Sequence, residues 1–298
     1  MFVITDPASF AAPLDVAGFP WSTIGRTRHV DDIVPHHTSD GAAVFPISDD
    51  VACLVLTGGR GYADESGKEQ VSVSCVQDDG FKGKPLPSGG AEPMPSGRFD
   101  HASVAAAGRV YVLGGSQRDA GGATTALSDV SFATFGAERS VRGWTRGRRL
   151  PGAASTLAAT SWGQRIYVVA PSFAPDRVFV GDVAADGSIL PWRPAGTMPA
   201  ARSAPSAIVW LGFLYILGGS GDGVPTVLIG RVDASTGTIS SWSADPADSF
   251  FGARRHPAVL ARGNRLYVFG SFFQSGGRGA PLQTAEIDPE TGRFKRWR

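Results

Sequence analysis

Tyr111-Val112-Leu113-Gly114 is the clearest copy of a short motif that returns along the chain. The other copies, in chain order, are Val55-Leu56-Thr57-Gly58, Tyr167-Val168-Val169-Ala170, Tyr215-Ile216-Leu217-Gly218 and Tyr267-Val268-Phe269-Gly270. Successive copies are 56, 56, 48 and 52 residues apart, and four of the five tyrosines occupy the first position of a copy. A repeat of about 50 residues with strand-like units indicates a radial array of small sheets.

The stretch from about residue 201 to residue 242 shows how one repeat is built. It contains four short segments, which we predict as strands a to d: Ser206–Trp210, Phe213–Leu217, Thr226–Val232 and Thr238–Trp242. Strand b is apolar on both faces, as expected for a strand that lies between neighbouring sheets. Gly237 stands in the turn before strand d, where positive φ is easiest for glycine. Four antiparallel strands joined by short turns form one blade of a propeller.

Three spaced features of this repeat resemble the kelch repeat. They are a strand b that ends Tyr-x-x-Gly-Gly, a tryptophan in strand d (Trp144, Trp192, Trp242 and Trp297), and a following Met-Pro-x-x-Arg that ends at Arg98 and again at Arg202. Over residues 41–298 the chain therefore resembles the kelch-repeat β-propeller family, which includes galactose oxidase. The resemblance implies a rigid binding platform or, less often, an enzyme. The third unit departs from it with Ala170-Pro171, and the first unit has Leu86 where a tryptophan is expected.

The number of blades depends on the N-terminus. Strands a and b occur together five times, whereas the c–d pattern occurs six times, the extra copy being Phe2–Asp6 with Gly18–Trp21. We predict an all-β, kelch-like propeller of five four-stranded blades over residues 41–298, with an N-terminal c–d-like hairpin extension over residues 1–40. A six-bladed ring is the alternative. The extra hairpin can cap the ring, lie against its side or complete a sheet elsewhere. Because an open sheet edge is a pairing hazard, we expect residues 1–39 to be covered, and docking on a neighbouring chain is one way to cover them.

Composition excludes several classes of protein. The net charge of +1 gives no overall attraction to nucleic acid or to an anionic membrane. No apolar run approaches the roughly 20 residues of a membrane span, and no secretory signal is visible. We therefore expect a protein without a membrane span or nucleic-acid partner, either cytoplasmic or assembled into a larger particle such as a virion.

The two cysteines, Cys53 and Cys75, fall on adjacent strands b and c of the first repeat. A disulfide and two buried free thiols both fit this placement. Because nothing else in the sequence indicates an oxidising compartment, we predict free thiols.

Charged residues are divided between the two sides of the predicted ring. The turns between strands c and d carry acidic residues, which are Asp6, Asp78, Asp79, Glu138, Asp186, Asp233, Asp288 and Glu290. The b–c loops and the links between blades lie on the other side and carry arginines, with two histidines at what we take to be one equivalent position before strand a. The predicted ligand-binding set is Arg60, Arg98, His101, Arg118, Arg177, Arg202, Arg254, Arg255, His256 and Arg278. Arginine recognises carboxylate and phosphate in a bidentate manner, although Arg98 and Arg202 also fit a staple between blades.

Other chemical sites find less support. His36-His37 has no third ligand at a suitable spacing, so we predict no metal and no cofactor. Asp119, Asp176 and Asp222 lie in b–c loops but form no obvious carboxylate pair. The copper-radical chemistry of some kelch enzymes needs a tyrosine cross-linked to cysteine and histidine ligands, and the repeated tyrosines here are expected to pack between blades.

These observations predict a non-enzymatic binding or structural propeller that presents an arginine-rich side to an acidic glycan or a protein partner. A component of a larger assembly, such as a phage tail or surface structure, fits the absence of a signal. The alternative is a carbohydrate-active enzyme, of the sugar-acid epimerase or lyase type, that uses arginine and histidine in the funnel. That alternative requires His101, His256 and a carboxylate to meet in one pocket.

Overall fold

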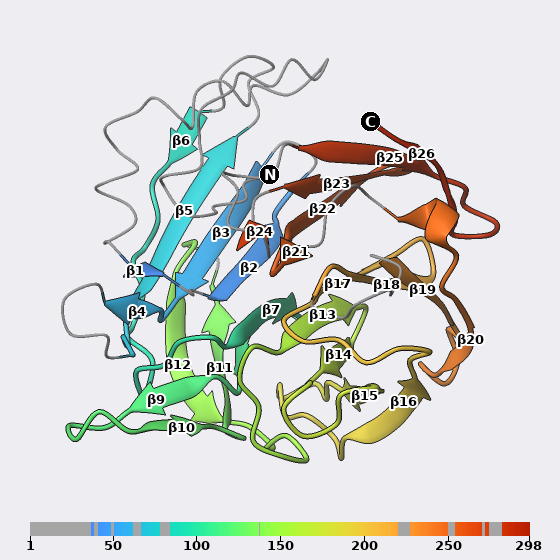
Figure 1. The fold of residues 1–298 in the computed structure, drawn as a ribbon. Coiled ribbons are helices and arrows are strands. Elements are labelled where there is room, and N and C mark those ends of the chain that lie inside the picture. The colour runs from blue at the N-terminus through green and yellow to red at the C-terminus, as the bar shows by residue number, and fades with distance from the viewer. Residues whose placement is uncertain are drawn as a thin grey trace.

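The computed structural model describes residues 37–38, 41–48, 51–61, 67–77, 84–136, 138–219, 227–249, 254–269, 272–273 and 282–298. Their strands form five four-stranded antiparallel sheets, and each sheet takes its strands from one consecutive stretch of chain (Figure 1). The described residues thus confirm the five-bladed propeller. The predicted hairpin at Phe2–Asp6 and Gly18–Trp21 lies outside them.

The strands of each blade follow the order a, b, c, d. Blade 1 contains β2 (Gly41–Pro46), β3 (Val51–Thr57), β5 (Val71–Gln77) and β6 (Lys84–Leu86). Blade 2 contains β7 (Ala102–Ala106), β8 (Arg109–Leu113), β11 (Val130–Phe135) and β12 (Val141–Arg146). Blade 3 contains β13 (Ala158–Trp162), β14 (Arg165–Val169), β15 (Arg177–Asp182) and β16 (Arg193–Thr197). Blade 4 contains β17 (Ser206–Trp210), β18 (Phe213–Leu217), β19 (Val227–Val232) and β20 (Ile239–Ser243), and blade 5 contains β22 (Ala258–Arg262), β23 (Arg265–Phe269), β25 (Gln283–Ile287) and β26 (Phe294–Trp297).

Smaller elements lie in the connections. Three two-stranded pairs are β1 (His37–Thr38) with β4 (Arg60–Gly61), β9 (Ser116–Arg118) with β10 (Thr124–Ala126), and β21 (Arg254–Arg255) with β24 (Phe272–Phe273). The 3₁₀ turn η3 (Pro246–Asp248) precedes blade 5. Among the described residues no helix is long and apolar enough to cross a membrane.

Strand a is the innermost strand of each blade. The a strands of successive blades contact one another, from β2 through β7, β13 and β17 to β22. The turns between a and b are tight, as at Leu211-Gly212, where φ is 51° and 79°. Two consecutive positive φ values are those of the hairpin turn that matches strand twist. The loops between b and c and the links between blades lie on the opposite side, which we call the loop side, and the a–b and c–d turns lie on the turn side.

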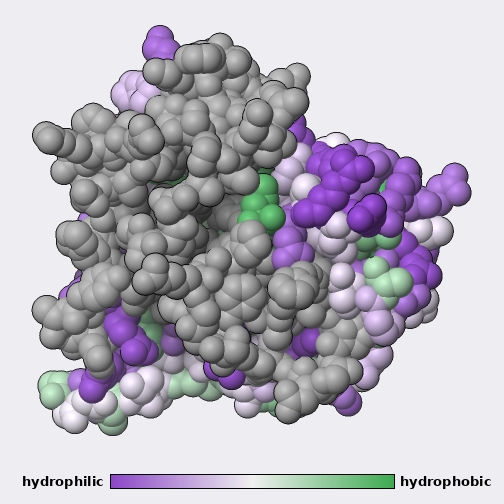
Figure 2. All heavy atoms as spheres, turned by 45° about the horizontal axis from the view of Figure 1, so that its top comes forward, coloured by the Kyte–Doolittle hydropathy of each residue, from purple (hydrophilic) through white to green (hydrophobic). Residues whose placement is uncertain are grey.

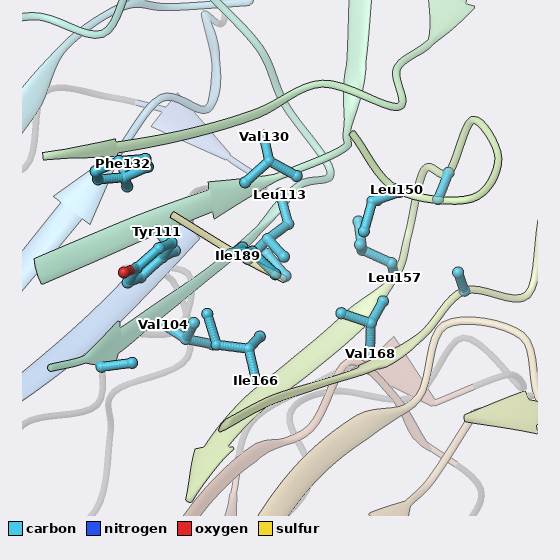
Figure 3. Close-up of a cluster of buried hydrophobic side chains, with 14 of the residues drawn as sticks. Val104, Tyr111, Leu113, Val130, Phe132, Leu150, Leu157, Ile166, Val168 and Ile189 are labelled. Atoms are coloured by element: carbon cyan, nitrogen blue, oxygen red, sulfur yellow. The ribbon is translucent and has the colours of Figure 1, made fainter. Parts of the chain in front are cut away.

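The hydrophobic core consists of separate layers between successive blades. Between blades 2 and 3, Tyr111 and Leu113 pack with Ile166 and Val168, and all four are at most 1% exposed (Figure 3). Equivalent layers join blades 1 and 2, blades 3 and 4, and blades 4 and 5. The frame is therefore held together by burial of the apolar faces of strand b.

The repeated aromatic residues pack and hydrogen-bond between blades, in agreement with a structural role. The hydroxyl of Tyr111 donates to the Gly187 carbonyl at 2.9 Å, and the hydroxyl of Tyr215 donates to the Gly292 carbonyl at 3.0 Å. Both acceptors lie in the c–d turn of the next blade. In strand d, the indole N–H groups of Trp144 and Trp297 donate to the link that leads into the same blade, at the carbonyls of Glu92 and Asp248.

Loss of the Tyr215 hydroxyl is expected to cost about 1 kcal/mol of unfolding free energy, because Tyr215→Phe leaves the buried Gly292 carbonyl without its donor. The matched control is Tyr167→Phe, whose hydroxyl is buried but makes no hydrogen bond within the described part of the chain. We expect that variant to unfold at the wild-type denaturant concentration. Equal destabilisation of the two variants would contradict the role of the hydrogen bond.

The prediction of two free cysteines is wrong, because Cys53 and Cys75 form a disulfide. The two residues are directly opposite each other in the β3–β5 register. The hydrogen bond from the Gly58 amide to the Gln70 carbonyl fixes the alternation along this strand pair, and Cys53 and Cys75 then occupy a non-hydrogen-bonded position. Side chains at such positions approach most closely, so the two sulfur atoms can bond.

Candidate functional site

Four residues before the a strands form what we call the inner rim on the loop side. Asp100, Thr156, Ala204 and His256 each stand two residues before strand a, and their φ values are 54°, 52°, 56° and 45°. The Thr156 amide donates to the Asp100 carbonyl at 2.9 Å, and the His256 amide donates to the Ala204 carbonyl at 2.8 Å. Non-glycine residues adopt positive φ at some cost and persist there only where the surroundings hold them. The inner rim is therefore a fixed platform for the side chains that it carries.

The prediction that His101 and His256 occupy equivalent positions is wrong by one residue. His256 is equivalent to Asp100, whereas His101 stands one residue closer to strand a and is equivalent to Pro257. Because of this offset of one residue, the two histidine side chains lie in different environments. His256 is exposed, and His101 is only 6% exposed.

His101 is a buried link between blades 1 and 2. Its Nε2 atom lies 2.9 Å from the Thr57 hydroxyl, which in turn lies 2.7 Å from the Ser103 hydroxyl. A methyl group on Gly41 would come within 2.4 Å of the same Nε2 atom, so the ring has no room to move on that side. Burial, assisted by the charge of Arg98, lowers the pKa of His101 to about 3. The imidazole is therefore neutral at ordinary pH and closed to solvent.

Arg98 and Arg202, which end the two Met-Pro-x-x-Arg segments, belong to the frame. Arg98 is 2% exposed, and its guanidinium donates to the Gly114 carbonyl at 3.0 Å and to the Ser96 hydroxyl at 2.9 Å. Burial lowers its pKa, while Asp129 raises it. Arg202 is 3% exposed, and burial lowers its pKa to about 10. Both arginines occupy the staple position that the repeat suggested, away from the solvent on the loop side.

Arg60 is presented on the loop side next to the inner rim. It follows the two glycines that end strand b of blade 1, and its guanidinium lies 4.1 Å from the centre of the Phe99 ring. One of its nitrogens is 3.9 Å from an Asp100 oxygen, at the outer limit of an ion pair, and 36% of the Arg60 side chain is exposed. Its Nε atom is buried and has no hydrogen-bond partner within the described part of the chain, so only the exposed part of the guanidinium is open to a ligand. Arg60 is thus held by stacking on Phe99 and is partly exposed.

Blade 5 brings two more polar residues, Arg255 and His256, to the same side of the ring. Crowding at the rim lowers the pKa of His256, although the residue as a whole stays exposed. The charge of Asp100 raises that pKa and the charge of Arg255 lowers it further. Arg60, Asp100, Arg255 and His256, which we call the rim cluster, come from blades 1, 2 and 5.

The remaining predicted residues lie elsewhere. Arg177 is exposed at the start of β15. Arg118 lies in β9, where its Nε donates to the Gly122 carbonyl at 3.1 Å, and it borders a hollow of about 480 Å³ together with Gly97, Gln117 and Asp119. The backbone of Arg254 pairs in β21, whereas its side chain, and Arg278 as a whole, lie outside the described residues.

The turn side contains interactions that sequence reasoning missed. Asp186, Asp233 and Asp288 each accept the amide of the residue two positions later, and the pKa of Asp233 falls to about 2 through its hydrogen bonds with Ser235 and Thr236. Arg109 and Arg165 donate to carbonyls in the c–d turn of the next blade, at Ala185 and Ala234. Several carboxylates on this side therefore accept hydrogen bonds within their own turns. The sequence signal was an arginine two residues before the strand-b tyrosine.

Hydrophilic residues are also exposed on the outer strands. Figure 2 shows them gathered at the right of that view, where Figure 1 places β25 and β26. Lys295 and Arg296 of β26 are exposed, and Lys295 pairs with Glu286 at 2.6 Å. These charges lie on the outer strand d of blade 5, away from the inner rim.

The cluster required for the enzymatic alternative is not formed by the described residues. His101 is bonded to Thr57 inside the frame, while His256 is exposed at the inner rim near Asp100. The described ranges also contain no group of three or more histidine, cysteine, aspartate or glutamate side chains placed to hold a metal ion. His36 lies outside those ranges, and of His37 only the backbone is described.

The sequence matches no known protein family and no curated protein. One solved structure, described as "Structure of YjhT", is similar to this chain with 13% identity and a TM-score of 0.49, covering 88% of this chain and 97% of that one. The resemblance to the kelch repeat thus stays a prediction, whereas the propeller fold itself is plain. Such a fold fits a binding or structural role.

Proposed function

We propose that this propeller is a non-enzymatic binding platform whose rim cluster receives an acidic group of a ligand or protein partner. The observation that carries the proposal is the state of Arg60. Its guanidinium is positioned by the Phe99 ring and is partly exposed, and within the described ranges its one ion pair is the long contact with Asp100. Arginine in this state binds carboxylate or phosphate well, because its planar donors are already oriented.

Three further features support an acidic ligand at this place. Arg255 adds positive charge from blade 5 beside the exposed His256. The inner rim holds its backbone in fixed, hydrogen-bonded positions, which reduces the entropy lost on binding. Arg98 and Arg202 are buried in the frame. The residues expected to contact a ligand are therefore the exposed members of the predicted set of ten.

The partner that we propose is an acidic glycan or an acidic surface of a protein within a larger assembly, such as a phage tail or surface structure. An extended polyanion would pass from the rim cluster toward Arg118 and Arg177, which lie on the same side of the ring. The proposed docking of residues 1–39 on a neighbouring chain concerns a segment that lies almost wholly outside the described residues and stays a prediction.

Substitution of Arg60 is expected to weaken binding of an acidic polymer about tenfold, because a charge-assisted hydrogen bond contributes roughly 1.5–3 kcal/mol. The probes are a labelled polyglutamate peptide and dextran sulfate, titrated against wild type and Arg60→Ala by fluorescence anisotropy at two salt concentrations. Wild-type affinity should fall as salt rises, because surface charges are screened.

Arg296→Ala is the matched control, since Arg296 is an exposed arginine on the outer strand β26. Its affinity for both polymers should equal that of wild type. The proposal fails if Arg60→Ala and Arg255→Ala bind as wild type does, or if Arg296→Ala loses as much affinity as they do.

A further inference from the structure

The Cys53–Cys75 disulfide occupies a position at which other blades also tie strand b to strand c. This position lies five residues before the end of the repeated strand-b motif, at Gly58 in blade 1. In blade 3 it holds an ion pair between Arg165 and Asp182 at 2.9 Å. In blade 4 it holds Phe213 under the guanidinium of Arg231, at 4.7 Å. Blade 1 therefore has a covalent bond where blade 3 has an ion pair and blade 4 has a stacked guanidinium.

Blade 1 lacks a support that other blades possess. Its strand d, β6, has three residues and ends in Leu86, whereas the strand-d tryptophans of blades 2 and 5 donate to the link leading into their own blade. Among the described residues, β5 pairs on that side with the short strand β6, which carries no such tryptophan. A bond between β3 and β5 replaces part of the missing support.

Both sulfur atoms are buried in the hydrophobic core. Cys53 is 0% exposed and Cys75 is 2% exposed, and both belong to the core layer between blades 1 and 2 together with Val55 and Val110. A dissolved oxidant reaches neither sulfur once blade 2 has packed on blade 1. The bond must therefore form while blade 1 is still accessible, during folding.

We infer that the working form of this protein is oxidised and that the chain folds in an oxidising compartment outside the reducing cytosol. The two thiols lose two protons and two electrons as the S–S bond forms, and a dithiol–disulfide oxidoreductase of that compartment accepts them as its own disulfide is reduced. Disulfides with a structural role form and persist in such environments and are rare where glutathione keeps thiols reduced. This inference does not depend on the proposed binding site. It replaces the expectation of a cytoplasmic protein, and of the two assemblies named above it favours a surface structure over a phage tail, which is assembled in the reducing cytosol of the host.

Thiol counting tests the inference without any variant. Protein isolated from its natural host is denatured without reductant and treated with an alkylating reagent. We expect no alkylated cysteine and an intact mass lower by two hydrogens than that of the reduced chain. Two alkylated cysteines would overturn the inference.

Stability measurements test the role of the bond. In the folded protein the bond should resist reductant, because it is buried, and it should be reduced readily in denaturant. Protein refolded after reduction, and kept reduced by reductant at the same pH, should melt roughly 5–10 °C lower, given the 22-residue separation of the cysteines.

Cys53→Ala/Cys75→Ala is the matched variant. It should melt near the reduced protein, and its melting temperature should be the same with and without reductant. Rapid reduction of the folded wild type, or equal melting temperatures of its oxidised and reduced forms, would overturn the structural role.

Discussion

Gly114→Ala is expected to lower the unfolding free energy by about 3–4 kcal/mol. Gly114 has a φ of 58°, and a methyl group built there lies 2.7 Å from the Ala154 carbonyl oxygen of blade 3. The next residue, Gly115, donates its amide to that same carbonyl at 2.7 Å. The methyl group must therefore push apart a hydrogen-bonded contact between two blades, in addition to the cost of positive φ.

The control for this variant lies in the same blade. Gly108 has a φ of 70°, but no atom lies within 4 Å of a methyl group built on it. Gly108→Ala should thus cost only about 1 kcal/mol, the backbone penalty alone. Chemical unfolding followed by tryptophan fluorescence compares the two variants. Similar losses of unfolding free energy in the two variants would mean that the close approach of blades 2 and 3 at Gly114 does not contribute to stability.

Acid is expected to destabilise the protein through His101 before most carboxylates titrate. Its pKa in the folded protein is about 3, against an ordinary value of 6.5. Between these two values the unfolded chain binds a proton that the folded chain does not, so stability falls as pH falls. The total loss of unfolding free energy on acidification through both pKa values is about 5 kcal/mol, of which about 2 kcal/mol is lost between pH 6.5 and 5.

His101→Asn tests this expectation, because asparagine retains a polar side chain that does not titrate. Unfolding midpoints in urea are measured at several pH values from 7 to 5. The variant should be less stable than wild type at pH 7, with a much flatter pH dependence. His256→Gln, at the exposed rim, is the control and should retain most of the wild-type slope. A wild-type slope in His101→Asn would show that another group controls acid sensitivity.

The sequence predicted the frame closely because the frame repeats. The predicted strands Ser206–Trp210 and Phe213–Leu217 coincide with β17 and β18. The departure at Ala170-Pro171 also has a structural counterpart. The Ala170 carbonyl accepts the amides of Phe173 and Ala174 in a local turn, whereas the paired glycines of blades 1 and 2 reach across to the next blade.

Errors arose where one residue of register decides the outcome. Sequence placed Cys53 and Cys75 on adjacent strands, but only the register shows that their side chains face each other. The same difficulty made His101 and His256 look equivalent. Sequence reasoning named Arg60, Arg255 and His256 among ten candidates but missed Asp100. It could not single out this group, because Arg60, Asp100 and His256 are far apart in the sequence and meet only through the order of blades around the ring.

Each blade of this protein is cut from one uninterrupted piece of the chain, and among the described strands none is exchanged between the first and last blades. Two of the interfaces between blades use the same contact at equivalent positions, from Tyr111 to Gly187 and from Tyr215 to Gly292. One blade therefore corresponds to one continuous segment of the gene. Duplication, loss or exchange of such a segment adds, removes or replaces a whole blade. Evolution can in this way change the size of the ring, or the loops of one blade, while the other blades keep their sequence.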